Sequence, residues 1–435
     1  MGIQNFPAAL QPIIQQNFLE REFQDGLKSR LGFRAVADRE EVSIGVGETV
    51  TKTRKGLKAP TTTPITPSNN TNLDNGLTPS AWTVEQYTLS LNMYGDTIDL
   101  NMVTQKVGIA SQFMQNAKTN GVQANQSLDR LARNALFGNY LGGNTRVSTT
   151  LGSAGTTVAV DDIRGFRNVL VNGVVTPISA ANPMTVTIGA GSYTLTGTTA
   201  DVTNTSTAPG GISGTLTLSG NVTVSDATAG NAVISATAPL LLRPNNKTST
   251  SSLLKTDLLT MQVVLNAVAQ LRANNVPTIN GKYHCYLDDF HLLELFQDPQ
   301  FQLLYRGAYG SDTYVNGQIL ELVGVLFIPT TEAYQQTLVG VPIRRAIVCG
   351  QGALVEGDFA ATGYSDVGDG DSLKQMIDGV CMVTREPLDR LQQIIAQSWY
   401  WIGGFAVPTD ATANTLIIPT ASNSYFKRAV VIESA

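Results

Sequence analysis

The chain has 435 residues, which is enough for two or three domains and a sizeable hydrophobic core. Charged residues make up only 14%, against about 25% in an average domain, and the net charge is -5. This balance argues against a nucleic-acid-binding surface of the usual kind, because phosphate contacts need clustered Lys and Arg. So weakly charged a chain is expected to bury much of its surface, including surface against copies of itself.

Three features bear on the cellular compartment. Cys285, Cys349 and Cys381 lie far apart and form no C-x-x-C pair, so neither a disulfide framework nor a zinc knuckle is predicted. The residues after Met1 lack the basic and apolar regions of a secretory signal. No window holds about 18 consecutive apolar residues, so no membrane-spanning helix is expected. We expect a soluble protein made in a reducing cytosol, without a membrane partner.

The first expected element is an amphipathic helical arm within Pro7 to Leu31, where apolar residues recur at roughly helical spacing among charged ones. From Glu40 to Asp99 the period changes to two, and Glu48 to Lys55 and Tyr87 to Met93 alternate as strands. The Pro-rich stretch between them predicts a long hairpin-like flap. One face of the second strand is expected to carry Tyr87, Leu89, Leu91 and Met93.

A basic cluster lies on the rising side of the flap. Lys52, Arg54, Lys55 and Lys58 follow one another over a short stretch that includes the first strand. Two interpretations remain open at this point, a solvated strand face and an ionic contact between subunits.

Asn101 to Asn139 is expected to form one long helix of roughly 55 Å, at about 1.5 Å per residue. Small apolar residues recur at alternating steps of four and three, which places them on one stripe. The alternative is an ordinary core helix broken at Gly108 or Gly121. The stripe consists of Val103, Val107, Ala110, Met114, Ala117, Gly121, Ala124, Leu128, Leu131 and Ala135.

An all-β module of about a hundred residues is expected between Gly143 and Lys247, because Thr alternates with Val or Leu and Gly-rich turns punctuate the stretch. The module holds no His or Cys and no apparent charge cluster, so we place no chemistry there. Its low charge makes it a candidate for display or for contact. Between Val147 and Leu242 its only charged residues are Asp161, Asp162, Arg164, Arg167, Asp201 and Asp226.

The remainder of the chain predicts mixed α and β structure. The apolar residues spaced between Leu254 and Leu271 are expected to line one face of a helix. This helix should stop before Pro277. Strand Tyr283 to Leu287 leads to a short helix that Asp288 caps. The later apolar stretches are expected to form one sheet and two closing strands: Ile319 to Ile328, Ala346 to Cys349, Val380 to Thr384, Leu391 to Val407, Leu416 to Thr420, and Ala429 to Ser434.

The search for chemistry yields no catalytic, cofactor-binding or metal-binding residue, and we predict no enzyme and no cofactor. His284, Cys285, Asp288 and His291 could be called a metal cluster, but His284 and Cys285 are adjacent in a strand and point to opposite faces. The acidic stretch 366–371 lacks the ligands that a calcium loop needs at its fifth and twelfth positions, so a turn is expected. Phosphate-loop, dinucleotide, hydrolase-elbow and zincin motifs are also missing from the sequence.

The order of these parts resembles the major capsid (coat) protein family of tailed bacteriophages, whose fold is shared with the encapsulin shells. In the C-terminal part, the helix, the strand Tyr283 to Leu287, the helix after Asp288, the stretch Gly324 to Thr330 and the closing strand pair follow the family order. Leu271 to Phe301 is similar to coat sequences of podophage type. The resemblance covers most of the chain outside the module at 143–247.

The resemblance implies an α+β fold with five parts. They are an N-terminal arm (1–39), an E-loop with flanking strands (40–100), the spine helix of a peripheral domain (101–142), an inserted all-β domain (143–247) and a peripheral and axial α/β domain (248–435). Some capsids of this fold join a flap lysine to an asparagine of a neighbour by an isopeptide bond. Lys52, Lys55 or Lys58 could be placed for that, but no identifying motif accompanies them.

The function that the resemblance implies is that of a shell subunit. Copies would assemble into hexamers and pentamers of an icosahedral capsid that encloses double-stranded DNA, with the protein made in host cytoplasm and located in the virion. Scaffolding, portal and decoration proteins are possible partners. The alternatives are an encapsulin shell subunit and a β-rich adhesin or tail protein.

Overall fold

The computed structural model describes thirteen segments of the chain: residues 32–42, 49–62, 64, 82, 84–101, 109–203, 208–304, 321–338, 340–359, 374–377, 379–385, 394–412 and 414–435. Three predicted parts lie outside these segments: the arm at Pro7 to Leu31, most of the Pro-rich flap stretch, and the acidic stretch 366–371.

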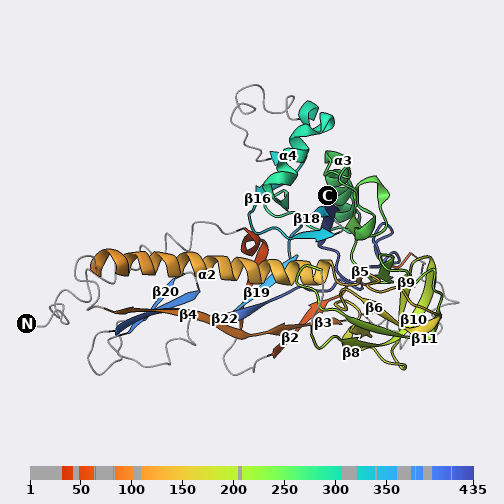
Figure 1. Cartoon of the computed structure of the whole chain (residues 1–435), viewed down its shortest axis with the longest axis horizontal. Coiled ribbons are helices and arrows are strands. Elements are labelled where there is room, and N and C mark those ends of the chain that lie inside the picture. The colour runs from red at the N-terminus through yellow and green to blue at the C-terminus, as the bar shows by residue number, and fades with distance from the viewer. Residues whose placement is uncertain are drawn as a thin grey trace, which may run out of the picture. The chain divides into compact units, whose positions relative to one another are not determined.

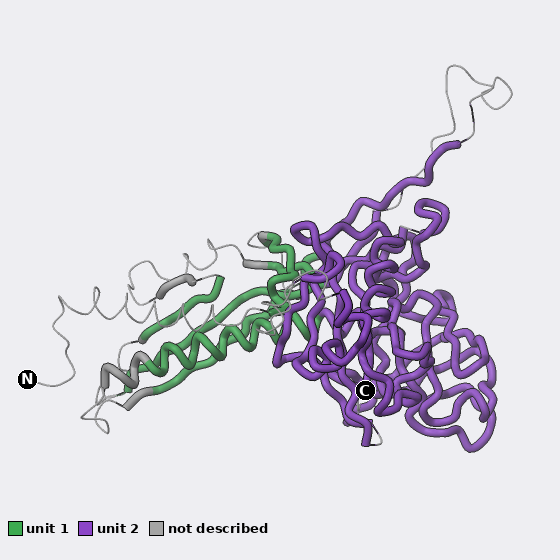
Figure 2. Tube along the Cα trace, turned by 90° about the horizontal axis from the view of Figure 1, so that it is seen from above, with its two compact units in different colours: residues 1–50, 88–135, 354–406 green, residues 51–87, 136–353, 407–435 purple. Residues whose placement is uncertain are grey.

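The chain divides into two compact units (Figure 2). Unit 1 consists of residues 1–50, 88–135 and 354–406, and unit 2 of residues 51–87, 136–353 and 407–435. Each unit therefore draws on segments that lie far apart in sequence, and we describe each by itself.

Unit 1 contains a six-stranded sheet. β1 and β19 pair in parallel, whereas the other neighbours run antiparallel. The 3-10 helix η2 (Phe33–Val36) leads into the first strand. The strand order is β1 (Ala37–Val42), β19 (Leu354–Phe359), β22 (Ile394–Ala406), β21 (Val380–Arg385) and β20 (Lys374–Ile377), and β4 (Asn92–Asn101) also pairs with β22.

The long helix α2 (Ile109–Tyr140) follows the strands β4 and β22 in Figure 1, and its residues up to Ala135 belong to unit 1. Ala124 and Leu128 are fully buried against Trp399 and Trp401 of β22. The prediction of a single helix is confirmed from Ile109 to its end, and a break at Gly121 does not occur. Gly108 lies outside the described residues.

Two details of the helix prediction are wrong. Asn101 ends strand β4, where it pairs with Ile394 of β22, so it is not helical. The buried stripe also drifts towards the C-terminus, where Leu131 and Ala135 are only half-buried while Ala132 and Leu136 are fully buried. A repeat of seven residues drifts about 20° per heptad around a 3.6-residue helix, so a strict repeat cannot stay on the buried face. The buried face includes three polar residues: Asn120, Asn125 and Asp129.

Unit 2 has a seven-stranded sheet on which the helices α3 (Met261–Ala273) and α4 (Asp289–Gln297) share one hydrophobic core. Two 3-10 turns, η3 (Pro244–Asn246) and η4 (Thr250–Ser252), precede α3. The strand order is β13 (Leu241–Leu242), β23 (Ala429–Ser434), β18 (Val341–Cys349), β14 (Tyr283–Leu287), β16 (Val325–Pro329) and β15 (Glu321–Leu322), and β17 (Gln335–Leu338) also pairs with β18.

A second, six-stranded sheet of unit 2 lies entirely within residues 144–235 and has its own hydrophobic core. Alternate residues of its strands are buried, as in β9 with Met184, Val186 and Ile188, so the Thr and Val alternation encodes one inner and one outer face. Its order is β5 (Asn144–Arg146), β12 (Ala232–Ser235), β9 (Met184–Ile188), β10 (Gly191–Ala200), β11 (Gly214–Val222) and β6 (Gly155–Val160), and β7 (Asn168–Val171) and β8 (Val174–Pro177) form a separate hairpin.

Strand β14 and helix α4 match the sequence prediction. Asp288 is the N-cap of α4 and accepts a hydrogen bond from the backbone N of His291 at 2.7 Å. The helix expected from Leu254, in contrast, begins only at Met261. Asp257 accepts a bond from the backbone N of Leu254 at 2.8 Å, which folds the preceding residues into a turn instead.

Three predictions about strands are wrong. The apolar run from Ile319 to Ile328 contains a turn, because Val323 and Gly324 adopt positive φ between β15 and β16. Leu416 to Thr420 is a turn, in which the backbone O of Asn414 accepts bonds from the N of Ile417 and Ile418 at 3.0 and 2.8 Å. The single C-terminal sheet is two sheets in two units, because β18 and β14 pair in one and β21 and β22 in the other.

Candidate functional site

The base of the predicted flap consists of β2 (Thr49–Lys55) and β3 (Val84–Ser90), which pair as a two-stranded sheet. Alternate β2 residues are exposed, as the period of two predicts. In β3, Tyr87 and Leu89 are buried as expected, but Met93 is 71% exposed. Met93 is already part of the next strand, β4, so the expected face of four residues ends at Leu91.

One loop of unit 2, residues 407–412, contacts both strands of the flap base, and we name it the clamp loop. From β2, Arg54 forms an ion pair with Asp410 at 3.4 Å between Nη1 and Oδ1. From β3, the carboxylate of Glu85 accepts bonds from the backbone N of Ala411 at 2.9 Å and from Oγ1 of Thr412 at 2.6 Å. Two distant segments of the chain are thereby fixed to the same loop.

The clamp loop is in turn held by the residues that precede β23. Nε of Arg428 donates to Oδ2 of Asp410 at 2.8 Å, and Nζ of Lys427 donates to the backbone O of Asp410 at 3.1 Å. Nη1 of Arg428 also donates to the backbone O of Gln351 at 2.8 Å. A displacement of the clamp loop would therefore disturb both the flap base and the start of β23, an inner strand of the seven-stranded sheet.

The two carboxylates of this cluster respond to their surroundings in opposite directions. The pKa of Asp410 is raised to about 6, mainly because the side chain is buried. Arg54 acts to lower this pKa, but burial outweighs Arg54, and the negative charge of Glu85 also acts to raise the pKa. Burial also acts to raise the pKa of Glu85, but the hydrogen bonds from Thr412 and Ala411 outweigh it and hold the pKa below its usual value. Asp410 is therefore the group of the clamp that titrates under mildly acidic conditions.

We expect Asp410→Asn to remove a pH-dependent part of the stability. The pKa of Asp410 is about 6 in the folded chain against 3.8 in the reference state, so the folded form binds the proton more tightly. The stability that Asp410 contributes by binding this proton is fully present below pH 3.8 and is lost as the pH rises towards 6. Urea unfolding between pH 4 and pH 7 should show wild type losing stability relative to the variant as the pH rises. A constant difference between the two proteins would contradict the raised pKa.

Glu85→Gln is expected to loosen the flap base without unfolding the unit. The amide keeps the shape of the side chain but replaces one acceptor oxygen by a donor, which faces the backbone N of Ala411 or the Thr412 donors. Hydrogen exchange of β2 and β3 amides should become about tenfold faster, which corresponds to roughly 1.4 kcal/mol. Gln86→Glu is the matched control, because the hydrogen bond to Gly173 comes from the backbone N of Gln86, which this substitution keeps. Equal exchange in Glu85→Gln and wild type would show that the clamp does not hold β3.

A hairpin of the Thr-rich region also contacts β3. The backbone N of Gln86 donates to the backbone O of Gly173 at 3.0 Å, at the turn between β7 and β8. Gly173 has φ +81°, and a Cβ there would collide with the backbone O of Val84. This close approach requires glycine. Several apolar side chains of the hairpin and of the flap base are exposed to solvent: Trp82, Val84, Val171, Val174 and Val175.

In unit 1, the segment that follows the predicted arm is fixed by two carboxylates. Oδ1 of Asp129 on α2 accepts bonds from the backbone N of Gly32 at 3.1 Å and of Arg34 at 3.2 Å. The guanidinium of Arg34 binds Glu356 of β19, with Nε at 3.0 Å from both carboxylate oxygens. Arg34, Glu356 and Asp129 are all at least 97% buried. Residues 32–34 are thus tied to both α2 and β19.

The sequence-based candidates meet different outcomes. Asp288 caps α4, and Nε2 of the buried His291 lies 2.7 Å from Oγ of Ser434. Burial lowers the pKa of His291 to about 3 and raises that of Cys285 to about 12, so both are neutral near pH 7. Among the described residues, no group of three His, Cys, Asp or Glu side chains could hold a metal. From the basic cluster, Arg54 forms an ion pair with Asp410 of the same chain, and an ionic contact of the cluster with another subunit stays a prediction.

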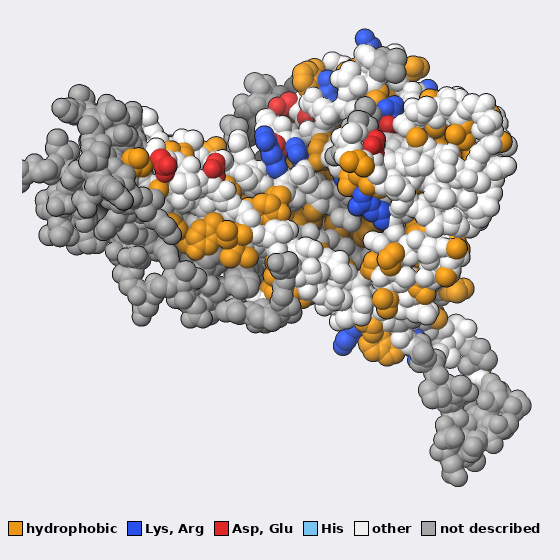
Figure 3. Space-filling model, turned by 60° about the horizontal axis from the view of Figure 1, so that its bottom comes forward, with side chains coloured by type: hydrophobic (Ala, Val, Ile, Leu, Met, Phe, Trp, Pro, Cys, Tyr) orange, Lys and Arg blue, Asp and Glu red, His pale blue; other side chains and the backbone are white. Residues whose placement is uncertain are grey.

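Two features of the site were not visible in the sequence. The Thr-rich region was expected to hold no charge cluster, but Asp161, Asp162 and Arg164 gather with Arg146 at one small cavity. Glu85 and the clamp loop carry no motif at all. On the face shown in Figure 3, charged side chains are sparse among the described residues, as the composition implies. None of the helices in the described segments is long and apolar enough to cross a membrane.

Comparison with known proteins identifies the fold. No family model matches the sequence, and no curated protein matches it either. Among solved structures, a chain of the cyanophage Pam1 capsid has a TM-score of 0.50 at 11% identity, covering 93% of this chain and 92% of that chain. Capsid chains of cyanophage P-SCSP1u and Ralstonia phage GP4 have TM-scores of 0.48 and 0.46 at 12% and 14% identity, each covering 93% of this chain and 88% of that chain. The chain therefore has the α+β fold of phage capsid proteins, as its resemblance predicts.

Proposed function

We propose that this chain is the major capsid protein of a tailed bacteriophage, a structural subunit without enzymatic activity. The observation that carries the proposal is the fold shared with the Pam1 capsid chain over 93% of this chain. The long single helix α2 and the two-stranded flap base support it, because both are parts of the order in which the sequence resembles the family.

The family parts are proposed with the boundaries that the resemblance implies: arm 1–39, E-loop 40–100, spine helix 101–142, inserted all-β domain 143–247 and peripheral and axial domain 248–435. The separate sheet and core within residues 144–235 support an inserted domain. The clamp loop and the Arg34 site support an E-loop and an arm that leave the subunit from fixed points. The podophage type is part of the same proposal.

The proposed mechanism is geometric. Arm and flap lie across neighbouring copies in hexamers and pentamers, and each contact buries weakly charged surface. Many weak contacts then add up to a stable shell, because each subunit that is already tethered binds its further neighbours at a high effective concentration. A clamped flap base loses less conformational entropy when the flap docks on a neighbour, so the Arg54 and Glu85 contacts favour assembly.

The net charge of -5 suits a shell that encloses double-stranded DNA without condensing it. Double-stranded DNA would then enter by means of a packaging motor, and its contacts with the coat would carry no sequence information. Scaffolding, portal and decoration proteins are the other proposed partners. The protein would be made in the host cytoplasm and reside in the virion.

Electron microscopy of particles purified from a producing culture tests the proposal. We expect icosahedral shells that contain DNA and whose main protein band is this chain. Rods, or a monomer at every concentration, would overturn the shell proposal. Shells that enclose an enzyme instead of DNA would assign the chain to the encapsulins. Material from the producing culture is preferable, because overexpressed subunits can require a scaffolding partner to assemble.

A further inference from the structure

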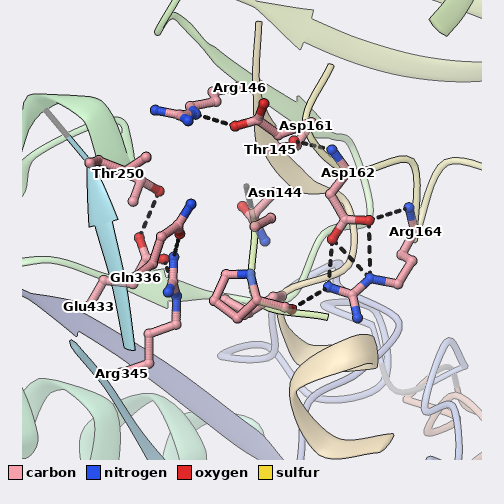
Figure 4. Close-up of a pocket in the computed structure, with 14 residues that line it drawn as sticks. Asn144, Thr145, Arg146, Asp161, Asp162, Arg164, Thr250, Gln336, Arg345 and Glu433 are labelled. Carbon is pink, nitrogen blue, oxygen red and sulfur yellow. Dashed lines mark hydrogen bonds and ion pairs between the residues drawn. The ribbon is translucent and has the colours of Figure 1, made fainter. Parts of the chain in front are cut away.

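Two groups of charged side chains in unit 2 differ in how their charges balance. At the small cavity shown in Figure 4, the charged residues of the lining are three arginines and three carboxylates. Beside helix α4, by contrast, the carboxylates of Asp288 and Glu294 both face the guanidinium of Arg344. We name these three side chains, together with His291, the α4 cluster.

The α4 cluster is buried around Arg344 of β18. Nε of Arg344 lies 3.2 Å from Oδ2 of Asp288, and Nη1 lies 3.4 Å from Oε1 of Glu294. The ring of Phe290 covers the guanidinium, whose Cζ lies 4.3 Å from the ring centroid. Asp288, Glu294 and His291 are 4%, 8% and 0% exposed. Water and salt therefore screen these charges only weakly.

His291 does not supply a second positive charge. Its Nε2 lies 2.7 Å from Oγ of Ser434, and its Nδ1 lies 3.2 Å from Oδ1 of Asp288. Burial, with a smaller contribution from Arg344, lowers the pKa of His291 to about 3, so the ring is neutral near pH 7. Within the described segments, no further cation lies at ion-pair distance from the two carboxylates. With both carboxylates ionised, the α4 cluster has one negative charge in excess, which one bound proton would neutralise.

Hydrogen bonds decide which carboxylate holds that proton. Asp288 accepts from the backbone N of His291 at 2.7 Å and from Nε2 of Gln335 at 3.3 Å. From uncharged groups, Glu294 accepts one bond, from the backbone N of Leu259 at 2.7 Å. An ionised carboxylate offers about four acceptor sites, so Glu294 is the less satisfied of the two. Since hydrogen bonds to a carboxylate favour its charged form, Glu294 is the easier group to protonate.

The electrostatics of Glu294 agree with this assignment. Burial raises the pKa of Glu294 to about 7, and the negative charge of Asp288 also acts to raise it. The bond from the backbone N of Leu259 and the charge of Arg344 act to lower this pKa, but burial outweighs them. Burial raises the pKa of Asp288 as well, so neither carboxylate relieves the other.

Glu294 connects α4 to the residues that lead into α3. Its Oε2 accepts from the backbone N of Leu259, which lies two residues before Met261, the first residue of α3. The side chain of Leu259 is fully buried and belongs to the hydrophobic core that α3 and α4 share. The bond to Glu294 therefore holds the start of α3 against α4.

A cleft of about 550 Å³ gives the side chain of Glu294 a route to solvent. Glu294 lines this cleft, which has room for several water molecules. The other charged residues of the lining already have partners. Arg243 binds Glu433 at 2.8 Å, and Asp298 accepts from the backbone N of Met261 at 2.7 Å. An ionised Glu294 would therefore gain solvation by turning towards the water of the cleft.

We propose that Glu294 is a proton-controlled latch on the start of helix α3. In its neutral form the side chain stays buried, and Oε2 holds the backbone N of Leu259. Loss of the proton leaves a buried charge without a partner of its own, so the carboxylate turns into the cleft and releases Leu259. The latch opens as the pH rises. The inference concerns unit 2 alone and does not depend on the proposed capsid function.

Hydrogen exchange of the full-length chain, measured by mass spectrometry on peptides that span residues 259–265, tests the latch. The closed latch binds the proton with a pKa of about 7, against 4.5 for a free Glu side chain. Protection from exchange is therefore fully present below pH 4.5 and is lost as the pH rises to 7. Protection factors, which allow for the intrinsic exchange rate, should fall by up to about tenfold per pH unit and level off above pH 7. Protection factors that do not change with pH would overturn the proposal.

Two variants assign the effect to Glu294. Glu294→Gln resembles the neutral carboxyl group, so protection at 259–265 should lose its pH dependence. Asp298→Asn is the matched control, because Asp298 binds the backbone N of Met261 in the same segment, and the fall with pH should remain. A fall that persists in Glu294→Gln would refute the assignment.

A comparison within the wild type keeps the test decisive if Glu294→Gln does not fold. Strand β18 belongs to the same unit and packs in the same core as α3, so its peptides report on unfolding of the whole unit. We expect the fall in protection at 259–265 to exceed that in β18 at least severalfold. Equal falls in both segments would mean that the unit opens as a whole and would overturn the latch.

Discussion

Replacing Glu356 by alanine is expected to lower the free energy of unfolding by about 3 to 5 kcal/mol. The side chains of Arg34 and Glu356 are 1% and 0% exposed, and Arg34 binds the carboxylate through both Nε and Nη2. Without Glu356 the guanidinium is a buried charge whose carboxylate partner is gone. Urea unfolding curves of wild type and variant measure the loss directly.

Two further variants make this result specific. Arg39 also lies near Glu356, at 3.8 Å, but its side chain is 47% exposed. Arg39→Ala should therefore cost under about 1 kcal/mol. The double variant Arg34→Met with Glu356→Leu removes both charges together and should recover most of the loss, because the desolvation cost disappears with the pair. A Glu356→Ala variant no less stable than Arg39→Ala would show that the pair does not anchor the chain.

A consequence for assembly is expected at residues 32–34, which follow the proposed arm. Arg34 and Gly32 are also held by Asp129 of α2 through their backbone N atoms. Loss of Glu356 would remove the ion pair of Arg34 while the bonds to Asp129 remain, so the segment before β1 should be held less firmly. If the chain is a shell subunit with an N-terminal arm, as proposed, that arm would need a fixed starting point in order to reach the same place on every neighbour. We therefore expect fewer and less regular particles alongside the lower stability.

Local signals in the sequence predicted local structure well. The stripe of small residues predicted helix α2, and Asp288 after a predicted strand indicated the N-cap of α4. Both depend on residues a few positions apart, which chain geometry alone brings together. Helix α3 was placed too early, because the carboxylates that bind the backbone N of Leu259 and Met261 come from Glu294 and Asp298 of a later segment.

The contacts of the clamp loop could not be predicted from such local signals. Glu85 and Ala411 lie 326 positions apart, and their contact exists only because two segments fold onto the same unit. A single Glu in an alternating strand carries no signal that it will be buried and bonded. The C-terminal strands divide between two sheets according to which strands pair. The periodicity of the sequence predicts a strand but does not identify its partner.

The other large effect is expected from overpacking the buried face of helix α2. Ala124 is fully buried in unit 1, in a cluster that contains Trp399 and Trp401 of β22. Leucine at this position adds three carbons to a space already filled by indole rings, and the helix must shift or the rings must leave their rotamers. Ala124→Leu should therefore cost about 2 to 3 kcal/mol, within the usual range for overpacked cores.

Gln126→Leu is the matched control, because Gln126 is an exposed residue of the same helix and leucine is a comparable helix former. Its stability should stay close to that of wild type. If α2 is the strut that keeps the sheet of unit 1 in one shape, Ala124→Leu particles should also be fewer or malformed by electron microscopy, whereas Gln126→Leu particles should be normal. Equal stability of the two variants would show that the packing around Ala124 adapts freely. Lower stability of Ala124→Leu with normal particles would confine its effect to folding and separate the strength of the helix packing from its role in assembly.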